Sequence, residues 1–167
     1  MFVVLTRANP MFQGELLGIF IADHKGEDLH SVAEIEAAAG QGLVGDRYCV
    51  REGQNKPSRE VTLIEVEALD ALARDYQLTL PPERSRRNLL TRRVPLNHLV
   101  GQTFRVGAAL LHGVELCEPC GHLEKLVFPG LRKGLAHRGG LRAQVLEGGT
   151  LRVGDPIQLT QKEPRTQ

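Results

Sequence analysis

Two cysteines have the clearest capacity for chemistry, and they lie in the segment Leu116-Cys117-Glu118-Pro119-Cys120-Gly121-His122. Thiolates are nucleophiles and soft-metal ligands, and this spacing lets both sulfur atoms face one metal ion or each other. A c-type haem site is excluded, because glycine rather than histidine follows Cys120. A zinc site would need further ligands, for which the chain offers Cys49 and scattered histidines. A redox dithiol is a further interpretation, although such pairs usually follow the first strand of a βαβ unit.

The two thiols differ in their predicted surroundings. Cys117 ends an apolar stretch that reads as a strand, and a free cysteine there behaves as a small buried hydrophobic residue. Cys120 follows a proline and precedes a glycine, which indicates a loop. Burial therefore explains Cys117 more easily than it explains Cys120.

Basic residues concentrate in the segment Arg84–Arg93, where five of ten residues are arginine. Guanidinium groups bind phosphate or carboxylate through paired hydrogen bonds, and Asn88 has an amide suited to the edge of a heterocycle. The alternative interpretation is a solvated basic surface. RNA binding is not indicated, because the segment has no interleaved aromatic residues.

A glycine-flanked loop, Gly42-Leu43-Val44-Gly45-Asp46-Arg47-Tyr48, is a second candidate binding segment. Its glycines permit a sharp turn that brings backbone N–H groups close to a ligand. In the alternative interpretation Asp46 caps an ordinary turn and Arg47 is solvated. The loop matches neither the P-loop nor the dinucleotide-binding pattern.

Composition limits the class of protein that carries these residues. The chain has 167 residues, 41% of them hydrophobic, and 21 Lys and Arg against 20 Asp and Glu. This length suits one domain with a full core, and the net charge of +1 gives no global attraction to nucleic acid or membranes. We expect one domain over residues 1–160 and a polar tail over 161–167. Without a recognisable signal peptide, we expect a cytoplasmic protein with reduced thiols.

The elements that must position these residues are mostly short strands, since scattered glycines and prolines divide the chain into short apolar segments. Helices are predicted over Ser31–Ala39, from a capping box and Gly40, over Glu65–Tyr76, from helical spacing, and over Pro129–His137. This mixture predicts a mainly β (α+β) fold, a closed or partly open barrel with two or three short helices. The predicted strands are Phe2–Thr6, Gly14–Ala22, Val61–Ile64, Phe104–Val106, Ala109–Leu116, Gln144–Leu146, Thr150–Val153 and Ile157–Leu159. Gly107 and Glu147-Gly148-Gly149 are predicted to join pairs of these strands as hairpins.

Taken in order, the motifs resemble the MOSC domain, named after the C-terminal part of molybdenum cofactor sulfurase. The resemblance extends from about Gly18 to Leu159 and is to a stand-alone bacterial-type member. It rests on six collinear motifs: GLVGDRY (42–48), REVTLIE (59–65), RRNLLT (86–91), LVGQTFRVG (99–107), CEPC (117–120) and GLRAQVLEGGTLRVGDPI (140–157).

The resemblance implies a barrel that binds a pterin-based molybdenum cofactor, with Cys120 as the protein thiolate on the metal. Family members are associated with carrying sulfur and with reducing N-hydroxylated compounds. In cofactor-binding relatives the residues matching Arg86 and Asn88 lie near the cofactor, whereas the position of Arg87 usually holds proline. The catalytic candidates are Cys120 and Cys117. The candidates for binding the cofactor are Gly45, Asp46, Arg47, Arg59, Arg86, Arg87, Asn88 and Thr91.

We therefore expect a molybdenum-cofactor (Mo-molybdopterin) protein that reduces N-hydroxylated compounds. The alternatives are a persulfide carrier for metal–sulfur or cofactor biosynthesis, and a barrel-type binding module without cofactor. The expected partners are a small-molecule substrate and an electron-donor or sulfur-donor protein, with neither nucleic acid nor membrane.

Overall fold

A computed structural model describes residues 12–51, 53–54 and 56–160 of the chain. The predicted strand Phe2–Thr6 and the predicted tail over 161–167 lie outside these residues. The strands are β1 (Gly14–Ile21), β2 (His30–Val32), β3 (Glu34–Ala38), β4 (Gly42–Leu43), β5 (Val61–Glu65), β6 (Leu89–Arg92), β7 (Thr103–Val106), β8 (Ala109–Leu116), β9 (Leu141–Glu147), β10 (Gly149–Arg152) and β11 (Pro156–Leu159). The α-helices are α1 (Val66–Tyr76), α2 (Gly121–Leu126) and α3 (Leu131–Gly134), and short 3-10 helices cover Pro57–Arg59, Pro82–Ser85 and Leu96–Leu99.

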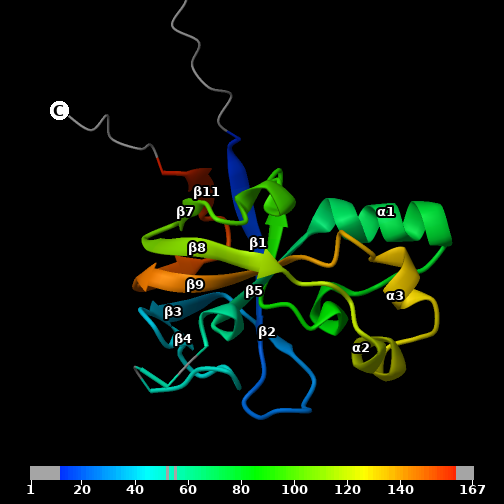
Figure 1. Ribbon diagram of the computed structural model, residues 1–167, viewed down its shortest axis with the longest axis horizontal. Helices are drawn as coiled ribbons and strands as arrows, with labels where there is room; N and C mark the ends of the chain where they lie inside the picture. Colours follow the sequence, from blue (N-terminus) through cyan, green and yellow to red (C-terminus); the bar gives the residue numbers. More distant parts are fainter. Residues whose placement is uncertain (1–11, 52, 55, 161–167) are drawn as a thin grey trace, which may run out of the picture.

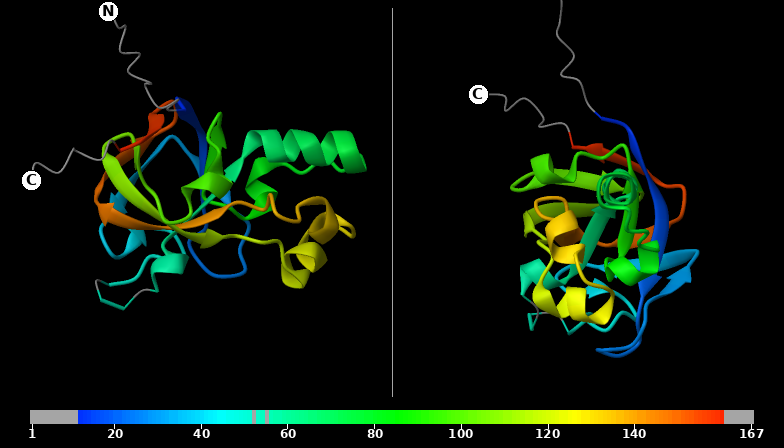
Figure 2. Two further views of the ribbon diagram at one scale, coloured as in Figure 1. Left: turned by 45° about the horizontal axis from the view of Figure 1, so that its top comes forward. Right: turned by 90° about the vertical axis from the view of Figure 1, so that its right-hand side faces the viewer.

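Seven strands close into a mixed barrel, so the predicted fold class is confirmed. The main sheet has the order β11-β7-β8-β9-β5-β6-β1-β2, and β11 also pairs with β1 to complete the circle. β5 and β6 are parallel and are connected through α1, whereas the other pairings in this sheet are antiparallel. The left panel of Figure 2 shows the barrel from near its open end. A smaller sheet with the order β10-β3-β4 lies beside it.

Strand periodicity divides the apolar residues between two cores. Successive side chains of a strand point to opposite faces, so Leu63 of β5 faces the barrel interior while Ile64 faces the helices. β6 repeats the pattern with Leu89 and Leu90. The helices α1, α2 and α3 cover one side of the barrel, as Figure 1 shows. The second core fills the space between them and the sheet.

Most predicted elements are confirmed, and their bounds shift by few residues. α1 occupies the second predicted helix, and α3 is shorter than predicted because it ends at Gly134. Gly107, with φ of 53°, connects β7 and β8 as predicted. β6 was not predicted, because its residues lie within the arginine-rich segment. α2 lies where a loop was predicted, directly after Cys120.

The predicted helix over Ser31–Ala39 is wrong, since β2 and β3 lie there instead. Exposed and buried residues alternate along β3, so Ile35 and Ala37 enter the barrel core while the glutamates beside them face solvent. Tertiary pairing with β10 outweighs the helix propensity of the alanines. Gly40 still ends the element, with φ of 69° in the turn toward β4.

The predicted hairpin between the segments around Gln144 and Thr150 is also wrong. β9 and β10 follow each other closely, but β9 pairs with β5 and β8, whereas β10 pairs with β3 in the smaller sheet. β11, rather than this hairpin, closes the barrel. No α-helix within the described ranges is long and apolar enough to cross a membrane.

Candidate functional site

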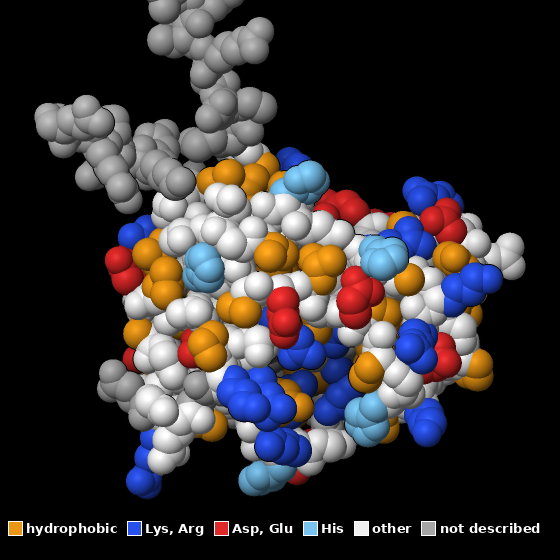
Figure 3. Space-filling view, viewed as in Figure 1, with side chains coloured by type: hydrophobic (Ala, Val, Ile, Leu, Met, Phe, Trp, Pro, Cys, Tyr) orange, Lys and Arg blue, Asp and Glu red, His pale blue; other side chains and the backbone are white. Residues whose placement is uncertain are grey.

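A cavity of about 340 Å³ lies beside the barrel, where the loops after β1, β4 and β8 meet the segment before β6. Among the residues that the structure describes, the charged lining is cationic and includes no aspartate or glutamate. Figure 3 shows basic side chains gathered around this hollow. The cationic lining residues are Lys25, Arg47, Arg59, Arg86, Arg87 and Arg142, and the others include Cys117, Cys120, Tyr48, Thr62 and His122.

Both thiols of the CEPC segment reach the cavity, but with different exposure. Cys117 follows β8 directly, is 1% exposed, and donates its N–H to the carbonyl of Gly140 at 2.7 Å. Cys120 is exposed and immediately precedes α2. All three cysteines of the chain are free thiols. The exposed sulfur available to a ligand in the cavity is therefore that of Cys120.

The Arg87 guanidinium holds the CEPC segment in place. Its side chain is buried, and it donates to the carbonyls of Gly139 at 2.9 Å, Cys117 at 3.1 Å and Ser85 at 3.4 Å. Within the described part of the chain no carboxylate pairs with it. Burial lowers the pKa of Arg87, while the nearby Cys117 opposes this change. The fold thus holds a guanidinium whose positive charge lacks an acidic partner.

Gly139 permits this contact between the residues just before β9 and the CEPC segment. A Cβ atom at Gly139 would lie 2.5 Å from the Cys117 carbonyl oxygen, which is closer than side-chain atoms approach backbone. The neighbouring Gly140 has φ of 114° and leaves no room for a side chain against the Leu63 carbonyl. Larger residues at either position would displace the segment that carries both thiols.

Arg47 is oriented by the residue before it. The buried Asp46 carboxylate accepts from the N–H groups of Ala22 at 3.2 Å and Tyr48 at 3.3 Å, and pairs with Arg47 Nη1 at 3.2 Å. Arg47 Nη2 donates to the Arg86 carbonyl at 3.4 Å. Its Nε is buried and has no hydrogen-bond partner among the residues that the structure describes. Buried polar groups without a partner are uncommon, so this donor is left unsatisfied by the described residues.

Arg86 adopts the left-handed conformation, with φ of 60°, at the end of the 3-10 helix Pro82–Ser85. Its Nη1 donates to the Glu27 carbonyl at 3.0 Å. Burial and the positive charge of Arg47 lower the pKa of Arg86. Arg59 lines the cavity from the end of the first 3-10 helix, and no carboxylate in the described ranges pairs with it.

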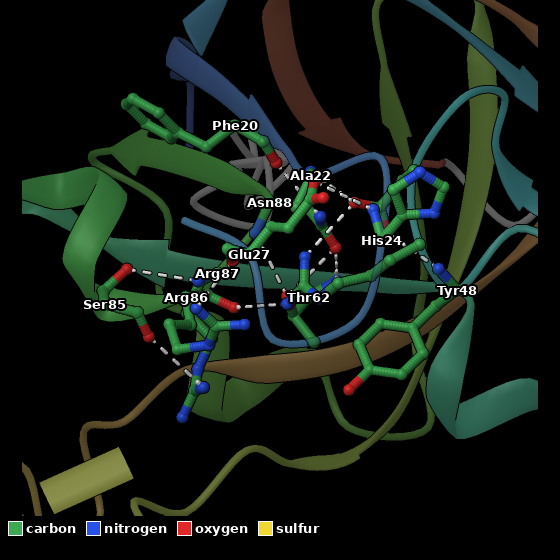
Figure 4. Close-up of polar contacts among 12 residues, drawn as sticks. Phe20, Ala22, His24, Glu27, Tyr48, Thr62, Ser85, Arg86, Arg87 and Asn88 are labelled. Atoms are coloured by element: carbon green, nitrogen blue, oxygen red, sulfur yellow. Dashed lines mark hydrogen bonds and ion pairs between the residues drawn. The ribbon is translucent and has the colours of Figure 1, made fainter. Parts of the chain in front are cut away.

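Asn88 and Thr91 do not line the cavity, although sequence reasoning placed both beside a cofactor. The Asn88 amide oxygen accepts from the N–H and hydroxyl of Thr62, both at 3.1 Å, and its nitrogen donates to the Phe20 carbonyl at 3.1 Å. Figure 4 shows Asn88 between these two residues. Thr91 donates to the Ile64 carbonyl at 3.4 Å. Asn88 thus orders the wall of the cavity, since its partner Thr62 lines it.

Gly45 and Asp46 are likewise outside the cavity lining and shape the loop that presents Arg47. Gly45 has φ of 94°, a backbone conformation that favours glycine. Of the predicted cofactor-binding residues, the structure therefore brings together Arg47, Arg59, Arg86 and Arg87 with both thiols.

Sequence reasoning missed Lys25 and Arg142. Arg142 lies on β9 opposite Thr62 of β5, and its Nε is 3.8 Å from the Glu115 carboxylate. The feature that could have identified Arg142 as a site residue is its place between two residues that are buried, Leu141 and Ala143. Lys25 lies 5.7 Å from the centre of the Tyr48 ring, and Arg47 lies 4.7 Å from it on the same ring. No sequence pattern distinguishes Lys25 from any other lysine in a loop.

Metal ligands of the usual kinds do not cluster here. Among the described residues, no three His, Cys, Asp or Glu side chains are placed to hold a metal ion. The cavity therefore presents a soft thiol together with a set of hydrogen-bond donors for anions.

Comparisons with known proteins agree with this fold. The chain resembles the YUAD protein from Bacillus subtilis, with a TM-score of 0.77, 18% identity, and coverage of 90% of this chain and 98% of that one. It resembles YiiM from Geobacillus stearothermophilus, with a TM-score of 0.68, 18% identity, and coverage of 89% and 75%. YiiM from Escherichia coli gives a TM-score of 0.64, 20% identity, and coverage of 92% and 71%. A search of curated proteins found no significant match. The family model of the MOSC domain matches residues 39–158, and the chain belongs to the MOSC domain family.

Proposed function

We propose that the cavity binds a pterin-based molybdenum cofactor, with Cys120 as the protein thiolate on the metal, and that the loaded protein reduces N-hydroxylated compounds. The observation that supports this most directly is an exposed thiol in a cavity whose described charged lining residues are all cationic. Membership of the MOSC family associates the chain with molybdenum-cofactor and sulfur chemistry in general.

The residues present fit such a cofactor in chemical type. Its metal is held by the sulfur atoms of the pterin, and a thiolate such as that of Cys120 is a suitable further ligand for a soft metal. Its phosphate needs charged donors, which Arg47, Arg59 and Arg86 provide. The Nε of Arg47 has no partner among the described residues, so the protein leaves this donor unused. The volume of about 340 Å³ falls within the usual range for ligand sites.

When bound, the cofactor supplies oxygen-atom transfer at its metal. The chain supplies position, charge and protons. Arg87 holds the segment carrying Cys117 and Cys120 against β9, so the thiol is presented at a fixed place. Reducing an N-hydroxyl group to an amine releases its oxygen as water and takes up two electrons and two protons. His122 lines the cavity, where its imidazole can donate or accept a proton, and the electrons come from a separate donor.

The test is to make the protein in a host that synthesises the cofactor, and to measure molybdenum and pterin per chain. We expect about one of each in the unaltered protein and a loss of molybdenum in Cys120→Ser. Cys49→Ser is the matched control, because Cys49 lies outside the cavity lining, and it should retain the metal.

Each other outcome identifies a different function. Cyanide-labile sulfur on Cys120 without molybdenum would contradict the proposal and favour a persulfide carrier. Neither metal nor labile sulfur would indicate a binding module. Equal molybdenum in Cys120→Ser and Cys49→Ser would show that another group holds the metal.

A further inference from the structure

A second cavity, also of about 340 Å³, adjoins the first. Arg86 lines both cavities, and α2 also contributes to both, through Leu123 to the first and Leu126 to the second. Leu126 lies six residues after Cys120, so about 9 Å of helix separates the second cavity from the exposed thiol. A ligand with its anionic part in the first cavity can thus extend past Arg86 into the second.

The walls of the second cavity suit a flat, polar ring. Leu29, Leu126 and Val127 provide apolar surface, and Leu126 is 44% exposed. Aromatic rings bury well against such surface. The volume is sufficient for a nucleobase-sized group.

The polar side chains of this second cavity determine which hydrogen-bonding edge of a ligand ring can bind there. Asp28 and Glu83 line it, and within the described part of the chain neither carboxylate accepts a hydrogen bond or forms an ion pair. An ionised carboxylate only accepts hydrogen bonds, so it requires donors on the ligand. Among the common bases, guanine offers a ring N–H and an amino group side by side. Adenine and cytosine place an acceptor beside the amino group, which a carboxylate repels.

The arginines supply the complementary donors. Arg84 Nη2 donates a hydrogen bond to the Leu126 carbonyl at 3.2 Å, and Arg86 Nη1 donates one to the Glu27 carbonyl at 3.0 Å. Each guanidinium keeps further N–H groups that these bonds do not use. Arginine pairs readily with the O6 and N7 acceptors of guanine and with phosphate oxygens. Arg86, between the two cavities, is placed for a phosphate.

The number of cationic side chains in the first cavity also favours a ligand with more than one phosphate. Six cationic side chains line the first cavity, more than one phosphate monoester needs. We propose that the second cavity is a binding site for the guanine ring of a guanosine phosphate whose phosphates lie at Arg86. The guanosine phosphate is either a nucleotide extension of the cofactor or a free nucleotide. Only the first of these sources rests on the proposed function.

The experiment uses the cofactor-free protein and guanosine diphosphate (GDP) as the probe, titrated calorimetrically. We expect GDP to bind at least 10-fold more tightly than inorganic pyrophosphate, ADP or CDP. Asp28→Asn and Glu83→Gln should each weaken GDP binding at least 5-fold while leaving pyrophosphate binding unchanged, and Arg86→Met should weaken both ligands. Asp28 and Glu83 are exposed, so these variants should fold. Asp70→Asn, on the exposed face of α1, is the matched control and should bind GDP as the unaltered protein does.

Equal binding of GDP and pyrophosphate would overturn the proposal, because the cationic cavity alone would then account for both. Unchanged GDP binding in Asp28→Asn and Glu83→Gln would also overturn it. Protein loaded with molybdenum distinguishes the two sources. Acid release of GMP in amounts equal to the metal identifies a cofactor extension, whereas metal without GMP, combined with GDP binding, identifies a free nucleotide. Protein that is made in a cofactor-synthesising host, contains no molybdenum and binds GDP would refute the proposed function while supporting this nucleotide site.

Discussion

Arginines on the outer surface and two arginines of the first cavity, Arg86 and Arg87, have different hydrogen-bond partners. On the surface, Arg152 pairs with Glu34 and Arg105 pairs with Glu147, each at 3.0 Å. In the cavity, the Arg87 guanidinium instead bonds to backbone carbonyls. A carboxylate cancels the charge of its arginine, whereas a carbonyl fixes the position of the guanidinium and leaves the charge in place. The difference shows how a chain with net charge of +1 keeps a strongly cationic site.

The largest expected effect comes from removing the Arg87 bonds. Arg87→Met leaves buried carbonyls without donors, at about 1–3 kcal/mol for each. Loss of a buried charge that has no acidic partner offsets part of this cost. We expect the free energy of unfolding to fall by about 2–3 kcal/mol, measured by urea titration followed by circular dichroism. Arg152→Met, which breaks an exposed pair, is the control and should change it by less than about 0.5 kcal/mol. Equal effects would remove the distinction between the two groups of arginines.

An added polyanion should stabilise the protein through the cavity arginines. Pyrophosphate at ten times its dissociation constant should raise the free energy of unfolding by about 1.4 kcal/mol, because it binds the folded state. The melting temperature should rise by roughly 3–6 °C. Arg47→Met and Arg59→Met should reduce the rise, whereas Arg105→Met should leave it unchanged. The same rise in sodium chloride of matched ionic strength would show general salt action instead.

Glu65 is a carboxylate that resembles Arg87 in one respect. No oppositely charged side chain in the described ranges pairs with it. Burial, then the nearby charge of Glu67, raises the pKa of Glu65 to about 7. The folded protein therefore holds a proton that the unfolded chain releases, and stability falls as the pH rises from about 4.5 to about 7. Glu65→Gln should remove on the order of 1 kcal/mol of this fall, since water screens a partly exposed charge. Identical pH profiles for Glu65→Gln and the unaltered protein would refute the assignment, and Asp70→Asn provides the control.

The smallest expected effect concerns the surface pairs themselves. Glu147→Gln removes the partner of Arg105, and both side chains are exposed. We expect the melting temperature to change by no more than about 2 °C, measured by calorimetry. A larger change would mean that surface carboxylates contribute more than their exposure indicates.

Sequence reasoning succeeded where a local pattern and the tertiary environment agree. The apolar stretch Ala109–Leu116 and the helical spacing along Glu65–Tyr76 correspond to β8 and α1. It failed at Ser31–Ala39, where alanines suited to a helix pair as β3 with β10. Nothing within that segment identifies β10 as its partner, because the two lie more than a hundred residues apart.

The candidate site shows the same limit. The two cysteines of the CEPC segment and the four predicted arginines are motif residues, and they line one cavity. Asn88 belongs to the same motif, but its amide is used by Thr62 and Phe20, partners that only the folded sheet brings near. Arg142 was missed because its role depends on its register with Thr62. Residue type indicates the chemistry, whereas strand pairing decides which side chains take part.

The pairing of β1 with β11 has a consequence for how the chain folds. Gly14 lies opposite Ile157, so the seam of the barrel joins residues from near the two ends of the described chain. Closing such a long loop costs entropy before its contacts form, and topologies of this kind fold in roughly milliseconds to seconds. During synthesis on the ribosome, β1 must wait with an unpaired edge until β11 has emerged. The unfinished barrel is therefore the state in which this protein is most exposed to aggregation.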